Sequence, residues 1–207
     1  RSTLFPYTTL FRSPYRWDLE AKLSGVSAWH TAGLPAKPVV TNVTIGIRSL
    51  DAYEQRAREL ADHPWLKIKV AADQAVAAVE AVRRGSPRAK LVVDANQAWT
   101  LATLREVAPE LQRLQVNLIE QPLRVGQDEE LSGYRCPIAI CADESLDGPD
   151  DLAKLVGRYQ FVNIKLDKTG GLTAALDLAE RATAAGFQLM VIWRSEERRV
   201  GKECRSR

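Results

Sequence analysis

Seven short apolar segments recur along the middle of the chain, with helical patterns between them. The segments are continuously apolar rather than alternating, which is typical of parallel strands that are covered on both faces. They are Val43–Ile47, Leu66–Val70, Leu91–Val93, Leu118–Ile119, Ile138–Ile140, Val162–Ile164 and Leu189–Ile192. Strands that alternate with helices in this way predict a parallel α/β sheet.

The stretches between these segments predict helices. The longer ones are Ser49–Ala61, Asp73–Arg84, Thr100–Leu114 and Leu172–Ala185. Thr100 is a good N-cap, and Gly186 suits the left-handed position that follows a helix. A shorter helix is expected to open at Asp147 or Pro149 and to run through Leu155.

One ionisable residue stands at the C-terminal end of each strand from the second to the sixth. These residues are Lys69, Asp94, Glu120, Asp143 and Lys165, spaced at near-constant intervals. A (β/α)8 barrel builds its active site from the ends of successive strands, whereas an open doubly wound sheet places its site at one switch point. The spacing therefore favours a TIM-type barrel, of which about seven strands are present.

Three of these residues are carboxylates, which would repel one another strongly if they converged unpaired. A hard divalent cation resolves this repulsion. Oxygen-only ligands select Mg²⁺ or Mn²⁺ over zinc. The sequence thus predicts a metal site at Asp94, Glu120 and Asp143. Both histidines, His30 and His63, lie away from the strand ends and are poor ligands.

Lys69 and Lys165 flank the three carboxylates in sequence and should face each other across a closed barrel. A lysine whose charged form is disfavoured by nearby cations can act as a base near neutral pH. Lys67 precedes Lys69 by two residues, so both point to the same face of the strand, and Lys67 can touch a substrate oxygen. Two bases beside a metal are suited to removing a proton α to a carboxylate.

The strand ends carry five short motifs. In chain order they are K-x-K at Lys67–Lys69, D-x-N at Asp94–Asn96, E-x-P at Glu120–Pro122, D-E-S at Asp143–Ser145 and K-x-D at Lys165–Asp167. This set of motifs resembles that of the enolase superfamily, in its muconate-lactonizing subgroup, and the match covers about residues 17–191.

The resemblance implies an isomerase that transfers a proton at one carbon through an enediolate. Within the subgroup, Asn163–Leu172 most resembles dipeptide epimerases of the L-Ala-D/L-Glu type. The alternatives are a cycloisomerase, an o-succinylbenzoate synthase, an N-acyl amino acid racemase, or a truncated fragment without catalysis.

The same resemblance implies a role for each residue of the motifs. Lys69 and Lys165 would be the acid/base pair, and Asp94, Glu120 and Asp143 would hold Mg²⁺. Thr44 and Lys67 match substrate-contact positions. Asn96 and Asp167 would contact the catalytic and metal-binding residues rather than the substrate. A small molecule such as L-Ala-L-Glu would be the substrate.

The two ends of the chain lack the periodicity of the middle. Residues 1–13 and 194–207 resemble translated sequencing-adapter sequence, and we expect both to be non-native. Residues 14–38 would then be the end of a capping domain, and residues 39–193 a partial barrel. Because most of the cap and the eighth strand are expected to be missing, we expect the chain by itself to be inactive.

Composition narrows the cellular context. The net charge is +3, but its basic excess lies in the two end segments, so a nucleic-acid partner is not expected. Three cysteines without regular spacing form neither a disulfide framework nor a zinc cluster, which favours a cytoplasmic protein. No apolar run is long enough for a membrane span, and the parent protein is expected to be a homo-oligomer.

Overall fold

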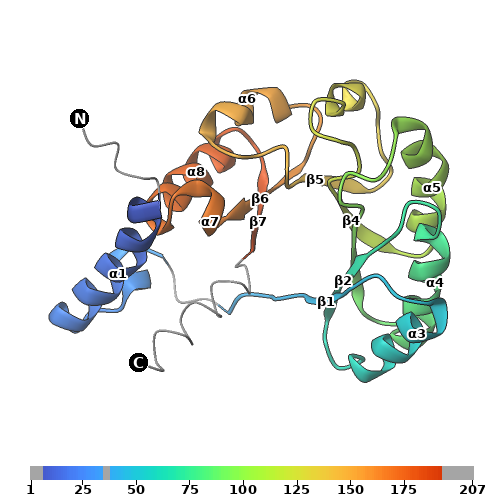
Figure 1. The fold of residues 1–207 in the computed structure, drawn as a ribbon, viewed down its shortest axis with the longest axis horizontal. Helices are drawn as coiled ribbons and strands as arrows, with labels where there is room; N and C mark the ends of the chain where they lie inside the picture. Colours follow the sequence, from blue (N-terminus) through green and yellow to red (C-terminus); the bar gives the residue numbers. More distant parts are fainter. Residues whose placement is uncertain (1–6, 35–37, 193–207) are drawn as a thin grey trace.

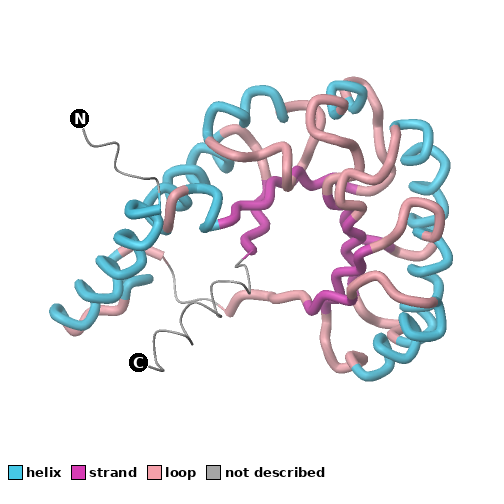
Figure 2. The backbone as a smooth tube through the Cα atoms, in the orientation of Figure 1, coloured by secondary structure: helices cyan, strands magenta, loops and turns pink. Residues whose placement is uncertain are grey.

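The computed structural model describes residues 7–34 and 38–192, and its strands form one parallel sheet. All seven predicted strands are present: β1 Val43–Ile45, β2 Trp65–Lys69, β3 Lys90–Asp94, β4 Val116–Glu120, β5 Ala139–Ala142, β6 Phe161–Lys165 and β7 Gln188–Ile192. They pair strictly in chain order, and the sheet curls into an open ring (Figures 1 and 2). A doubly wound sheet would reverse its order at a switch point, so the barrel prediction is confirmed.

Helices cover the outside of this ring (Figure 2). They are α3 Leu50–Glu59, α4 Ala75–Gly85, α5 Leu101–Arg113, η1 Asp128–Leu131, η2 Pro149–Asp151, α6 Leu152–Leu155, α7 Leu166–Thr169 and α8 Leu172–Ala184. Thr100 caps α5 by accepting a hydrogen bond from the N–H of Thr103, and Gly186 is left-handed after α8, both as predicted. None of the described helices is both long and apolar enough to cross a membrane.

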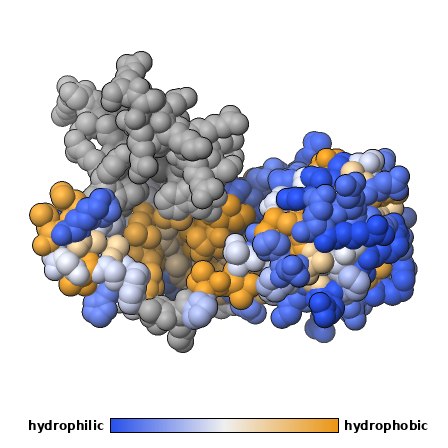
Figure 3. All heavy atoms as spheres, turned by 90° about the horizontal axis from the view of Figure 1, so that it is seen from below, coloured by the Kyte–Doolittle hydropathy of each residue, from blue (hydrophilic) through white to orange (hydrophobic). Residues whose placement is uncertain are grey.

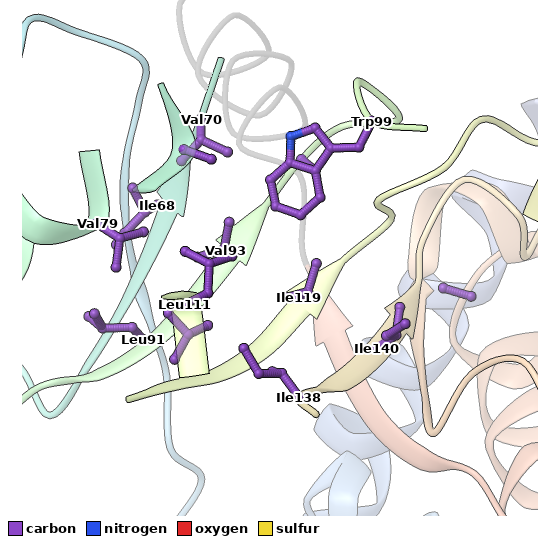
Figure 4. Close-up of a cluster of buried hydrophobic side chains, with 14 of the residues drawn as sticks. Ile68, Val70, Val79, Leu91, Val93, Trp99, Leu111, Ile119, Ile138 and Ile140 are labelled. Atoms are coloured by element: carbon purple, nitrogen blue, oxygen red, sulfur yellow. The ribbon is translucent and has the colours of Figure 1, made fainter. Parts of the chain in front are cut away.

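A large hydrophobic core lies between the strands and the helices. Ile68, Val93 and Ile119 of neighbouring strands point to the side on which Val79 of α4 and Leu111 of α5 lie (Figure 4). All five side chains are fully buried. These are the alternate positions of each strand, so the remaining positions face the inside of the ring.

The inside of the ring is apolar at one end and charged at the other. Val92, Leu118 and Cys141 form a second, smaller buried cluster, against which Trp65 and Phe161 pack. A cavity of about 180 Å³ lies at this end of the strands. The residues further along the same strand faces are Lys69, Asp94, Glu120 and Lys165, so the fold places the predicted site above an apolar floor.

The two outermost described strands are not paired with each other. Apolar side chains gather around the hollow in the middle of the face drawn in Figure 3. Val40, which precedes β1, and Val191 of β7 are 71% and 61% exposed. The open side of the ring is therefore lined by hydrophobic residues.

Two helices precede the barrel, α1 Tyr7–Ser24 and α2 Ala28–Thr31, and α1 lies beside α8 (Figure 1). The indole of Trp17 donates a hydrogen bond of 3.1 Å to Thr173 Oγ1 in α8. The sequence assigned residues 14–38 to the end of a capping domain, whereas α1 begins before that segment, at Tyr7. It runs across the boundary expected at residue 13, which stays a prediction because a helix can cross a junction. Residues 1–6 and 194–207 lie outside the described part.

Helices α3 and α4 approach each other closely at Gly85. A Cβ added there would lie 2.3 Å from the carbonyl oxygen of Glu54 and 2.7 Å from the Cβ of Ala57. Both distances are far shorter than van der Waals contact, and one of the atoms belongs to the backbone. The pair of helices therefore requires glycine at this position.

We predict that Gly85→Ala lowers the free energy of unfolding by about 1–3 kcal/mol, because overpacking outweighs the better helix propensity of alanine. Urea denaturation of the 207-residue chain measures this change. Gly46→Ala is the matched control, since a Cβ there meets nothing within 4 Å. The control should leave stability unchanged or raise it by up to about 1 kcal/mol. Equal effects of the two substitutions would contradict the close approach.

Candidate active site

Three buried carboxylates lie at the C-terminal ends of β3, β4 and β5. Asp94 and Glu120 are neighbours in strand register, and Asp143 follows Cys141, the register partner of Glu120, by two residues. Each of the three residues is no more than 3% exposed. Asp94 and Glu120 share one lysine, Lys67, whereas Asp143 pairs with Lys165.

The ammonium of Lys67 lies between two of these carboxylates. Its Nζ is 2.9 Å from Asp94 Oδ2 and 2.7 Å from Glu120 Oε2, and the lysine side chain is 6% exposed. Burial alone would lower the pKa of Lys67, but the two carboxylates outweigh burial and hold this pKa above its usual value. Lys67 therefore remains charged. Its predicted role in contacting substrate stays a prediction.

Glu120 is buried among charged groups of both signs. Burial raises the pKa of Glu120 to about 7, and although Lys67 opposes this shift, the carboxylates of Asp94 and Asp143 add to it. The charge of Lys67 is stabilised by two carboxylates, those of Asp94 and Glu120. Among the described residues, Glu120 contacts one ammonium group, that of Lys67, which also contacts Asp94. Three lysine ammonium groups, Lys67, Lys69 and Lys165, contact the three carboxylates.

The donor set fits a hard divalent cation, although the described residues contain no three His, Cys, Asp or Glu side chains already arranged as a metal-binding group. Lysine ammonium groups instead contact each of the three carboxylates. Asp143 Oδ1 is buried without a hydrogen-bond partner among the described residues. Oxygen-only ligands suit Mg²⁺ or Mn²⁺. The assignment of the three residues as its ligands stays a prediction.

Lys69 and Lys165 come from opposite walls of the ring, because β2 and β6 face each other across it (Figure 1). Lys69 Nζ donates a hydrogen bond of 2.7 Å to Asn96 Oδ1 and lies 3.4 Å from Asp94 Oδ2. Lys165 Nζ donates a hydrogen bond of 2.6 Å to Asp143 Oδ2. Each predicted base is therefore anchored beside a different carboxylate of the cluster.

The other predicted residues differ in how they relate to the cluster. Asn96 makes two hydrogen bonds to it. Its N–H donates to Asp94 Oδ1 at 3.0 Å, and its Oδ1 accepts a hydrogen bond from Lys69 Nζ. Thr44 is exposed and is the register partner of Lys67. Asp167 lies in α7, and its side chain is outside the described part of the structure.

Two amide side chains of the site were not predicted. Asn163 Nδ2 donates to Glu120 Oε1 at 3.0 Å, and Gln121 accepts from the N–H of Asp143 at 2.8 Å. Asn163 could have been found, because it precedes Lys165 by two residues and shares its strand face. Gln121 occupies the variable position of the E-x-P motif, so no pattern in a single sequence marks it.

Comparisons with known proteins agree with this geometry. A sequence profile of the enolase C-terminal domain-like family matches residues 51–197. The chain is 40% identical over 178 residues to an N-acetyl-D-glutamate racemase from a Pseudoalteromonas species and to the L-Ala-D/L-Glu epimerase of Escherichia coli K12. Each match covers 84% of this chain and 56% of the relative.

Two solved structures have the same fold. An enolase family member from Agrobacterium tumefaciens, described with bound sodium and L-Ala-L-Glu, is 43% identical with a TM-score of 0.81, covering 86% of this chain and 55% of that one. A dipeptide epimerase from Enterococcus faecalis V583, complexed with Mg and L-Leu-L-Tyr, is 31% identical with a TM-score of 0.81, covering 87% and 53%.

The chain spans about half the length of these relatives. The profile nevertheless covers most of the chain, from α3 through β7. The same stretch contains all five strand-end residues. The protein therefore belongs to the enolase C-terminal domain-like family.

Proposed function

We propose that this chain supplies the proton-transfer site of a metal-dependent dipeptide epimerase. The observation that carries the proposal is the placement of Lys69 and Lys165 on opposite walls of the ring, on either side of three buried carboxylates. Epimerisation at one carbon requires a base on one face and an acid on the other.

Each lysine would act on one face of the substrate α-carbon. Lys69 would accept the α-proton of one epimer while Lys165 delivers a proton to the opposite face, and the roles would reverse for the other epimer. Asn96 and Asp143 hold the two Nζ atoms by hydrogen bonds, which fixes where each proton leaves and arrives. The reaction is balanced, because one proton is taken up and one is released.

The carboxylate cluster would hold the cofactor. Asp94, Glu120 and Asp143 would bind Mg²⁺, or Mn²⁺ in its place, and the cation would supply positive charge against the negative charge that develops on the substrate carboxylate. Lys67 lies in the same layer and would contribute further positive charge toward the substrate. Dipeptide-bound and Mg-bound relatives support this arrangement.

A second candidate is an N-acyl amino acid racemase. One relative at 40% identity is named for N-acetyl-D-glutamate, whereas another at the same identity is named for L-Ala-D/L-Glu. Both substrates are glutamate acylated on nitrogen, so the same two lysines would perform the same proton transfer. Parallel assays with L-Ala-L-Glu and N-acetyl-glutamate distinguish the two.

A cytoplasmic, homo-oligomeric parent protein is part of the proposal.

The first prediction from this function concerns the metal. The chain should bind one Mn²⁺, and Asp143→Asn should weaken binding by at least about 100-fold because a charged ligand is lost. Electron paramagnetic resonance of free Mn²⁺ measures the affinity directly. Asp147→Asn is the matched control: Asp147 is an exposed carboxylate that pairs with Lys168, and its loss should leave the affinity unchanged. Equal affinities of wild type and Asp143→Asn would exclude the proposed ligand set.

The second prediction concerns the two lysines. Residues 17–191 would replace the matching segment of the Escherichia coli epimerase, which provides the remaining length of the protein. In D₂O this chimera should exchange the glutamate α-proton of L-Ala-L-Glu and L-Ala-D-Glu, as measured by proton NMR. Lys69→Ala should abolish exchange from one epimer, and Lys165→Ala from the other.

The control for this experiment is Lys154→Ala, because Lys154 is an exposed lysine of α6 that pairs only with Asp151 among the described residues. It should leave both exchange rates unchanged. The two-base mechanism would be wrong if either catalytic lysine could be replaced with both exchange reactions intact.

A further inference from the structure

Gln121 follows Glu120 directly and has an unusual environment. Gln121 is fully buried, and its backbone φ is +34°. Residues other than glycine rarely adopt positive φ values, and such strain persists where surrounding contacts over-determine the conformation. The contacts that hold Gln121 therefore outweigh the cost of its backbone.

The side-chain amide of Gln121 uses both of its ends. Oε1 accepts hydrogen bonds from the N–H groups of Asp143 at 2.8 Å and of Ser145 at 3.1 Å. Nε2 donates to Leu123 O at 2.9 Å and Ser145 Oγ at 2.8 Å, with the hydroxyl of Tyr159 at 3.3 Å. A buried amide that is satisfied in this way resists displacement, because any shift leaves polar groups unpaired.

The backbone of Gln121 joins the neighbouring strand ends as well. Its N–H donates to Cys141 O in β5 at 2.9 Å, and its carbonyl accepts from the N–H of Gln97, after β3, at 2.8 Å. Gln121, which directly follows β4, is thus hydrogen-bonded both to β5 and to the loop after β3. Asp94, Glu120 and Asp143 lie at the C-terminal ends of β3, β4 and β5.

Gln121 adds a backbone constraint beside the hydrogen bond of the Asp143 carboxylate. Asp94 accepts from the N–H of Asn96, and Glu120 accepts from Asn163. The carboxylate of Asp143 has Lys165 as its partner on Oδ2, while Oδ1 has no hydrogen bond within the described residues. Lys165 thus holds the carboxylate of Asp143, and Gln121 holds the backbone from which that side chain projects.

We propose that Gln121 is a positioning residue, which places the Asp143 carboxylate beside Glu120 by binding the N–H groups of Asp143 and Ser145. Gln121 contacts no reacting group itself. The inference about backbone placement stands on geometry alone, and its consequence for metal binding rests on the proposed function.

The test uses hydrogen exchange and Mn²⁺ titration of the 207-residue chain. In the wild type, the amides of Asp143 and Ser145 should be protected although they lie beyond the end of β5. Gln121→Met removes both hydrogen bonds at nearly constant volume, so exchange at these two amides should accelerate at least about 10-fold relative to Val93 in β3. Mn²⁺ affinity should fall about 10- to 100-fold, as for other residues that orient a ligand.

Two controls separate positioning from loss of stability. Gly85→Ala destabilises the protein far from the site and should leave Mn²⁺ affinity unchanged. Tyr159→Phe removes one contact of Nε2 but neither contact of Oε1, so it should preserve protection of Asp143 and Ser145. If Gln121→Met does not fold, Gln121→Asn retains the amide but is one methylene shorter, and the same loss of protection is expected.

The outcomes are distinguishable. Unprotected amides at Asp143 and Ser145 in the wild type, or unchanged protection in the Gln121 variants, would overturn the inference. A wild-type chain that binds no Mn²⁺ would contradict the proposed metal site, while the exchange measurements would still decide the role of Gln121. A loss of Mn²⁺ affinity in Gly85→Ala as large as that in Gln121→Met would assign the effect to stability and reject positioning.

Discussion

The burial of three carboxylates in one layer of the ring is the constraint on which the site depends. Ionised carboxylates taken out of water carry a large free-energy cost unless positive charge lies next to them. Lys67 supplies this charge to Asp94 and Glu120, and Lys165 supplies it to Asp143. Burial is the largest cause of the raised pKa of Glu120, and Lys67 opposes it only in part. A cluster of this kind is prepared for an additional cation.

The fold makes such a cluster possible by separating two environments along the same strands. Toward their beginnings, Trp65, Leu118 and Phe161 line the ring with apolar side chains. Toward their C-terminal ends, the inward positions become ionisable. Because the hydrophobic core between strands and helices stabilises the sheet independently, the charged layer need not contribute to stability and is free to serve chemistry.

Much of the fold could be predicted because each strand is a continuous apolar run bounded by helices. The motifs at Lys67–Lys69 and Asp94–Asn96 revealed chemistry, because charged residues at strand ends contrast with the core around them. The extent of α1 was not predicted, since residues 7–13 lie in a segment that lacks the periodicity of the middle of the chain. Gln121 was missed for a different reason: its role arises from contacts with a segment more than twenty residues away, and those contacts exist only after folding.

The most direct test of the account is the stability of Lys67→Met with and without Mn²⁺. Without metal, loss of the ammonium leaves Asp94 and Glu120 uncompensated, so the free energy of unfolding should fall by about 3 kcal/mol. Saturating Mn²⁺ should stabilise the variant more than the wild type, because the cation replaces the missing charge. A variant as stable as the wild type, with an equal response to Mn²⁺, would contradict the claim that these buried carboxylates require positive charge.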